Sequence, residues 1–200
     1  MRVLGLDVSK HAGWALWETK NALASIRCDV MEFPAKASIE YCADQMGLKV
    51  TKLIKDEKPD FIVLETALKM SPGGSAVSIV SSCMLHGAVY ATLGNWGKPW
   101  GTISVGTWRK MFFGQGFTCP LDAKGKKDWK RAAIEQCELE GITLPAKKTI
   151  RDNAAEAAAL AVCWRGADIH AGRYIPAFQG FLQQRNERDP SGDLFAGVGA

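Results

Sequence analysis

The sequence lacks several features that would place it in a specialised class of protein. Its six cysteines are far apart with no C-x-x-C pair, and its three histidines show no ligand spacing. This pattern argues against a zinc site and favours free thiols in a reducing cytoplasm over a disulfide framework. No apolar run approaches the ~18 residues that span a bilayer, and the acid at Asp7 comes too early for a secretory leader. We therefore expect a cytoplasmic protein that does not bind membranes.

What is present is a chain of ordinary globular composition. Its 200 residues are 47% hydrophobic and 23% charged, enough for one domain with a sizeable core and too few for two large ones. We expect residues 1–182 to form this single domain. The polar, glycine-rich segment 183–200 is expected to be a flexible C-terminal tail.

Positive charge is concentrated in one part of the chain. The net charge is +4, yet residues 1–97 are balanced, while residues 98–131 carry eight basic residues against two acidic ones. Such an asymmetry suggests contact with a polyanion. A solvated basic surface produces the same pattern, so composition alone leaves both interpretations open.

The order of the expected elements predicts an α/β protein. Short apolar runs rich in β-branched residues indicate five strands, at residues 2–8, 13–17, 24–32, 61–64 and 100–105. Apolar positions at helical spacing indicate helices at residues 38–56, 76–93, 128–140 and 150–166, and a short one starting at 106. The first three strands form an antiparallel meander, and the whole order predicts one central mixed five-stranded sheet flanked by helices.

The helix at 76–93 differs from the others because it is apolar or small almost all round. Such a helix must be covered by the core or by a partner. We expect a homodimer, because this helix would expose too much apolar surface in a monomer.

Four carboxylates lie where the apolar pattern makes them unusual. Asp7 ends the first strand, Glu65 ends the most apolar strand, and Asp152 and Glu156 lie four residues apart on one face of an alanine-rich helix. Each alone has an ordinary explanation, such as a first-turn helix acid or the start of a loop. No basic residue is an obvious partner, so converging acids would repel one another unless a divalent cation neutralised them.

The carboxylate ligands limit which metal ions would bind and which reaction those ions would support. Carboxylate oxygens without a set of thiolates or imidazoles favour Mg²⁺ or Mn²⁺. A pair of ions held by carboxylates is the usual apparatus of phosphodiester hydrolysis, one ion activating water and the other stabilising the leaving oxygen. Convergence of the four acids would therefore indicate a metal-dependent nuclease.

These motifs resemble the RuvC-type Holliday junction resolvases of the ribonuclease H-like superfamily. The resemblance covers residues 1–165 and rests on G-L-D-V-S at the first strand, G-W-A in the second, I-V-L-E at the end of the fourth and D-N-A-A-E-A at the late helix. It implies a ribonuclease H-like fold, a homodimer and Mg²⁺-dependent cleavage of four-way (Holliday) or other branched DNA. It also implies that Asp7, Glu65, Asp152 and Glu156 are the catalytic metal ligands, with two ions per site.

The last motif departs from the family pattern. The family has two metal-binding positions three residues apart, whereas here Asn153 stands three residues before Glu156, and Asp152 stands four before it. Asp152 reaches the same helix face, a spacing similar to that of phage and prophage members, and Asn153 is a weaker oxygen ligand. The sequence leaves open which of the two completes the site.

The basic stretch agrees with the same resemblance. Family members place basic residues on the short helix after the fifth strand and at the start of the next helix, where this chain has Arg109, Lys110, Lys126 and Lys127. We expect these four residues to bind DNA, because basic groups stabilise charge near the scissile phosphate and neutralise backbone phosphates.

Several apolar and aromatic residues lie close to these motifs and basic residues. Leu68 and Met70 fall where the family often carries an aromatic wedge that opens the junction, a role that an apolar side chain can fill. Trp108 and Trp129 lie beside the basic residues and could stack on bases. The histidines are assigned no role.

The same sequence features raise three alternative functions. A ribonuclease H or another structure-selective nuclease shares the metal site and differs only in substrate geometry. A catalytically weak junction-binding protein results if the changes at Asn153 and Glu156 have cost activity. An actin-like ATPase, whose first phosphate hairpin also resembles G-L-D-V-S, is disfavoured because that fold needs two homologous halves.

Overall fold

The structure is a computed structural model that describes residues 1–67, 75–166, 180, 183 and 187. Leu68 and Met70, the predicted wedge residues, lie outside the described residues. The same holds for most of the predicted tail at 183–200.

Five strands form one mixed sheet in the order β3-β2-β1-β4-β5. They are β1 (Arg2–Asp7), β2 (His11–Glu18), β3 (Arg27–Glu32), β4 (Phe61–Glu65) and β5 (Trp100–Ile103). The first three pair antiparallel, whereas β4 runs parallel to both β1 and β5. Short connections suffice on the antiparallel side, and the parallel side needs helical crossovers. The predicted α/β architecture with a mixed five-stranded sheet is confirmed.

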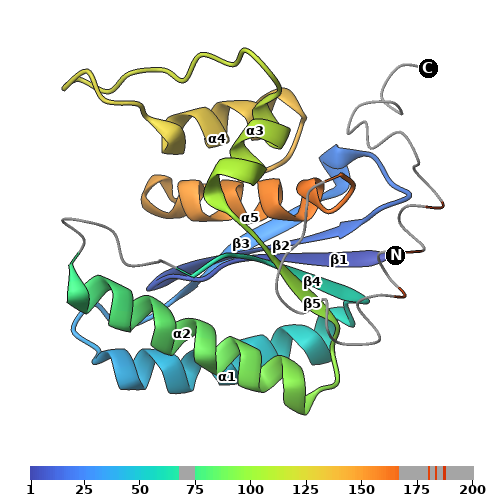
Figure 1. Cartoon of the computed structure of the whole chain (residues 1–200), viewed down its shortest axis with the longest axis vertical. Coiled ribbons are helices and arrows are strands. Elements are labelled where there is room, and N and C mark those ends of the chain that lie inside the picture. Colours follow the sequence, from blue (N-terminus) through green and yellow to red (C-terminus); the bar gives the residue numbers. More distant parts are fainter. Residues whose placement is uncertain (68–74, 167–179, 181–182, 184–186, 188–200) are drawn as a thin grey trace.

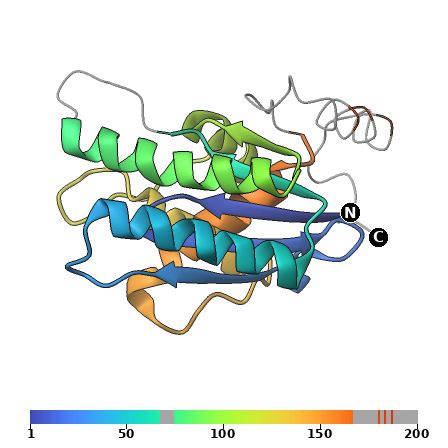
Figure 2. The same ribbon diagram turned by 90° about the horizontal axis from the view of Figure 1, so that it is seen from below.

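Helices cover both faces of this sheet (Figure 1). On one face lie α1 (Ile39–Glu57) and α2 (Ala76–Asn95), which run side by side in Figure 2. The other face is covered by α5 (Arg151–Cys163), with α3 (Val105–Phe113) and α4 (Trp129–Leu139) packed beyond it. The expected helices are therefore all present, within a few residues at their ends.

Two expected strands are shorter than predicted. The segment 24–32 begins with a 3-10 turn, Leu23–Ser25, in which the Ser25 hydroxyl donates to the Ala22 carbonyl at 2.7 Å. The strand at 100–105 ends at Ile103, because Ser104 caps α3 by accepting the Thr107 amide at 3.2 Å. Local hydrogen bonds to serine side chains stop or delay both strands.

The sheet separates two apolar cores. Alternation along β1 and β4 sends Val3, Phe61 and Val63 toward α5 and their neighbours Leu4 and Ile62 toward α1 and α2. Both strands are buried on both faces, as their continuous apolar runs predicted. By the same alternation Asp7 and Glu65 belong to the α5 face.

Two glycines let α5 lie very close to the sheet. A Cβ atom at Gly5 would be 2.2 Å from the Ala157 carbonyl oxygen, and one at Gly13 would be 1.9 Å from the Asn153 carbonyl oxygen. Most side chains of α5 itself are small, and nearly all are buried. This close contact sets the first two turns of α5 against the ends of β1 and β2.

The helix α2 is long and apolar enough, by length and composition, to cross a membrane, with 33% of its window buried. The prediction that no segment reaches this length was therefore wrong. One such helix is weak support for a membrane span, because core helices pass the same test. The inner side of α2 contributes Leu85, Val89 and Leu93 to the core, whereas Val77 is 75% exposed.

Candidate active site

The four predicted acids come from three elements that meet at one end of the sheet. Asp7 is the last residue of β1 and Glu65 is the last of β4. The two strands are parallel neighbours with Leu6 opposite Leu64, so their carboxyl ends lie at the same edge. Asp152 and Glu156 occupy successive turns at the start of α5, which crosses the same face (Figure 1).

The charges of these acids act on one another. Asp7 is 8% exposed. Burial raises its pKa well above the usual range, and the carboxylates of Glu156, Glu65 and Asp152 raise it further. Burial and the nearby Glu65 carboxylate raise the pKa of Glu156 to about 7. The structure thus brings all four predicted acids into one electrostatic cluster.

Glu65 is fixed by two neighbours that sequence analysis did not identify as part of the site. Its Oε2 accepts a hydrogen bond from Trp108 Nε1 at 2.8 Å. The Nε2 atom of His86 lies 3.1 Å from the Glu65 backbone oxygen, and its Nδ1 lies 2.8 Å from the Ser82 oxygen. His86 therefore ties α2 to the end of β4, although its sequence spacing gave no sign of a role.

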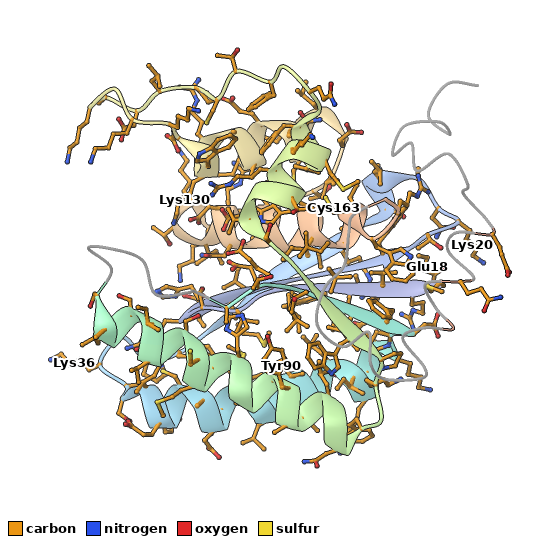
Figure 3. The ribbon with its side chains drawn as sticks, viewed as in Figure 1. Glu18, Lys20, Lys36, Tyr90, Lys130 and Cys163 are labelled. Atoms are coloured by element: carbon orange, nitrogen blue, oxygen red, sulfur yellow. The ribbon has the colours of Figure 1, made fainter. Side chains whose placement is uncertain are left out.

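Asp152 is also paired, although the sequence showed no obvious basic partner for the acids at the strand ends. Lys130 Nζ lies 2.5 Å from Asp152 Oδ2, and the lysine charge also acts on Glu156 and Asp7. Figure 3 labels Lys130 beside α5. Because α4 carries this lysine and packs on α5, only the tertiary contact could reveal the partner.

The carboxylate oxygens are chemically suitable ligands for a hard divalent cation. In the side-chain positions shown, no three Asp, Glu, His or Cys groups of the described residues gather closely enough to hold one metal ion. The Asp7 side chain nevertheless makes no hydrogen bond or ion pair within the described part of the chain, and it is buried among like charges. Such a carboxylate needs a cation or a proton to balance it. The donor set therefore fits Mg²⁺ or Mn²⁺.

A cavity opens at the cluster on the side of α2. It has a volume of about 450 Å³, and its lining includes Asp7 and Glu65 from the sheet and Ser78, Ser81 and His86 from α2. The two strand-end acids therefore line a cavity between the edge of the sheet and α2 that is large enough to receive a ligand.

Of the four predicted DNA-binding residues, Arg109 is the one that lies beside the acid cluster. Its charge lowers the pKa of both Glu65 and Glu156. Its guanidinium lies 4.6 Å from the ring centre of Trp129 and 5.3 Å from that of Trp108. Its Nε is buried and has no hydrogen-bond partner in the described part of the chain. Arg109 is thus a cation without a carboxylate of its own, next to the cluster.

The other three predicted DNA-binding residues are exposed. Lys110 is on α3, and Lys126 and Lys127 are in the loop between α3 and α4. Asp122 orders this loop, because its Oδ1 accepts the backbone amides of Lys124 and Lys126, each at 2.8 Å. These lysines therefore form a basic rim on the α3–α4 side of the site.

Comparisons with known proteins agree with this architecture. No family model and no curated protein matches the chain. Among solved structures, RuvC of Thermus thermophilus superposes with a TM-score of 0.57 at 14% identity, covering 92% of this chain and 96% of that one. The same protein in complex with a Holliday junction substrate gives 0.58 at 13% identity, covering 92% and 95%.

A third structure extends the likeness to a eukaryotic protein. The yeast mitochondrial Holliday junction resolvase gives a TM-score of 0.52 at 12% identity, covering 94% of this chain and 83% of that one. At such identities the likeness establishes the fold. The chain therefore has the ribonuclease H-like fold of the RuvC-type Holliday junction resolvases, as its motifs predicted.

Proposed function

We propose that this protein is a metal-dependent endonuclease of the cytoplasm that resolves four-way (Holliday) or other branched DNA junctions by phosphodiester hydrolysis. The observation that carries the proposal is that Asp7 and Glu65 end neighbouring strands at one edge of the sheet, where their charges and those of Asp152 and Glu156 from α5 act on one another. The fold shared with RuvC adds support, since that protein is known in complex with a Holliday junction. Six free cysteines suit a reducing compartment.

The four acids are the proposed ligands of Mg²⁺, or of Mn²⁺ in its place, with two ions per site. When bound, such ions supply an activated water and a stabilised leaving oxygen. The chain's own residues set the conditions for binding. Trp108 orients the Glu65 carboxylate, while Lys130 competes with any metal for Asp152. We infer that Asp152 rather than Asn153 completes the ligand set, because a carboxylate is the stronger ligand for a hard cation and Asp152 lies one helical turn from Glu156.

The basic residues are proposed to hold the DNA. Arg109 faces the acid cluster and is placed to contact the phosphate nearest to it, stabilising charge that develops there. Lys110, Lys126 and Lys127 would neutralise phosphates farther along the strand.

A homodimer is the proposed assembly. Val77 and Val80 on the outer side of α2 are 75% and 55% exposed, and Gly87 on the same helix is also exposed. A second copy packed on this face would bury the valines, and two sites would allow paired nicks across a junction. Sedimentation at micromolar concentration should show a dimer. An active monomer would contradict the assembly.

One observation favours the binding-protein alternative. Asp152 is already paired with Lys130, and no three ligand groups of the described residues are gathered around a common point. A protein with this arrangement could bind junctions and cut them slowly. A ribonuclease H, or another structure-selective nuclease, is the alternative that keeps the same metal site and acts on a different substrate.

The decisive experiment presents the wild-type protein with a four-way junction, a flap and an RNA–DNA hybrid, each with Mg²⁺ or Mn²⁺. We expect cleavage of the four-way junction in preference to the other two. Binding without cleavage under both metals would support the binding protein. Cleavage restricted to the hybrid would replace the resolvase by a ribonuclease H.

A further inference from the structure

Four aromatic rings gather where α3, the following loop and α4 meet. Phe113 and Phe117 stack with ring centres 4.4 Å apart and planes 16° apart. Trp129, the first residue of α4, lies 5.7 Å from Phe113 and 6.3 Å from Phe117. Trp108 contacts Phe113 from the core side at 6.2 Å. Apart from Trp108, these rings are only partly buried, and Phe117 is 38% exposed.

Phe113, Phe117 and Trp129 line a cavity of about 580 Å³, which we name the aromatic pocket, whereas Trp108 lies behind it in the core. The lining also includes Gly106, Arg109, Lys110, Gly114, Gln115 and Gly116. Gly114 and Gly116 have φ of 79° and 80°, a backbone region that favours glycine, and they turn the loop so that Phe117 stacks back on Phe113. The volume is within the range of small-molecule sites.

The charges around the aromatic pocket are positive. Arg109 stacks on Trp129, the Nζ of Lys127 is 5.8 Å from the same ring, and Lys110 lines the pocket. Aromatic faces flanked by unpaired cations suit a ligand that joins a planar ring to an anion. A nucleotide has this composition, with a base that stacks and a phosphate that binds arginine or lysine.

Arg109 belongs to both the aromatic pocket and the acid cluster. It lines the pocket, and its charge also acts on Glu65 and Glu156. Trp108 likewise contacts Phe113 on one side and donates to Glu65 on the other. A phosphate bound by Arg109 would therefore lie between the pocket and the carboxylates.

We propose that the aromatic pocket receives one nucleobase unstacked from the branch point of the DNA, with the adjoining phosphate held by Arg109 and Lys110. The proposal rests on the proposed function and adds a base-recognition site to it. A branch point provides the base, because the continuous stack of base pairs is broken where the arms meet, so a base there has less stacking to lose. Capture of the base positions the neighbouring phosphate beside the acids. The exposed amide of Gln115 is available to the edge of the base.

The test compares Phe117→Ala with Leu121→Ala in the full chain. Leu121 is 58% exposed in the same loop and is not among the residues that line the pocket, so it is the matched control. The probe is a four-way junction with 2-aminopurine at the branch, in EDTA so that no cleavage occurs. We expect Phe117→Ala to raise the Kd about 10-fold and to reduce the fluorescence change of the probe. Leu121→Ala should match the wild type.

Two further variants separate stacking from packing. Phe117→Tyr keeps the ring and should bind as the wild type does, whereas Phe117→Leu keeps the apolar contact and should bind as weakly as Phe117→Ala. The salt dependence of binding should not change in any of them, since no charge is lost. If both Phe117→Ala and Phe117→Leu bind the junction with wild-type affinity, the proposal that the aromatic pocket receives a base is wrong.

The outcome is distinguishable from failure of the proposed function. If the wild type resolves junctions and Phe117→Ala binds them normally, the resolvase stands and the pocket is wrong. If the wild type cuts no junction, affinity for a short single-stranded oligonucleotide still tests the pocket. Loss of that affinity in Phe117→Ala would support it, and unchanged affinity would refute it.

Discussion

The two faces of the sheet are covered by helices of different kinds. On one face α1 packs through Met46, Val50 and Ile54, with polar side chains turned to solvent, and a Cβ at its single glycine would come no closer than 3.3 Å to a neighbour. On the other face α5 is buried almost all round and touches the strand backbones through Gly5 and Gly13. The first arrangement tolerates variation in side-chain size. The second leaves no room for a larger side chain between α5 and the strands, which suits a precise arrangement of the proposed metal ligands.

The largest expected effect comes from removing one charge on the α5 face. Asp7→Asn keeps the side-chain volume but takes away the most buried acid of the cluster. We expect cleavage of a four-way junction to fall at least ~100-fold, the scale of one lost electrostatic stabiliser. Metal-free junction binding should stay the same or tighten, because a charge that repels phosphate is gone. Full activity would remove Asp7 from the metal site.

The fourth ligand can be assigned by the same assay. The Asp152 side chain is 13% exposed and its charge acts on Asp7. We expect Asp152→Asn to lose most of its activity and Asn153→Ala to retain most of it. The reverse pattern, an active Asp152→Asn with an inactive Asn153→Ala, would assign the position to Asn153.

Tightening the α5 contact should destabilise the fold. Gly5→Ala would put a methyl group 2.2 Å from the Ala157 oxygen, an overpacking that costs ~1–3 kcal/mol of unfolding free energy. On the other face, a Cβ at Gly47 would lie 3.3 Å from Thr92 Oγ1, and the gain in helix propensity is up to ~1 kcal/mol. Thermal melts should show a clear loss for Gly5→Ala and little change for Gly47→Ala. Equal melts would mean that α5 shifts freely.

The acid cluster should make the metal-free protein sensitive to pH. The folded-state pKa of Glu156 is about 7, above its ordinary value of 4.5, so this group stabilises the fold below about 4.5 and that stability is lost as pH rises through 7. In EDTA, the melting temperature of the wild type relative to Glu156→Gln should fall across this window. Mg²⁺ should restore it. Glu135→Gln, at a 47% exposed side chain of α4, is the control that should show no trend.

The smallest expected effect is on junction binding when lysines of the basic rim are replaced. Lys126 and Lys127 are exposed in the loop between α3 and α4, so replacing both by Ala should weaken junction binding without altering the fold. If each neutralises one phosphate, the slope of log Kd against log salt should decrease by about 2. An unchanged slope would show that this loop lies away from the DNA.

Local pattern determined much of the fold. Continuous apolar runs identified β1 and β4, and apolar residues at helical spacing identified α1, whose N-cap Ser38 accepts the Tyr41 amide. The same runs ended on Asp7 and Glu65, which is why those two acids could be named as site residues. The 3-10 turn at Leu23–Ser25 was missed because a hydrogen bond from Ser25 overrides the extended preference of its neighbours.

The partners of the acids could not be predicted in this way. Trp108 bonds Glu65 across 43 residues, and Lys130 pairs with Asp152 across 22. Neither pair has a spacing that helix or strand geometry would bring together. The same is true of His86 and of the aromatic pocket, whose rings come from two helices and a loop.

The sequence by itself determined the strands, the helices and the four acids, because backbone preference and alternation of apolar residues act over a few neighbours. The tertiary structure alone decided which groups surround those acids. Long-range packing of α4 and α3 on α5, and of α5 on Gly5 and Gly13, brings Lys130 and Arg109 to the carboxylates. Burial and charge at such a site depend on contacts between distant segments, which no local pattern encodes.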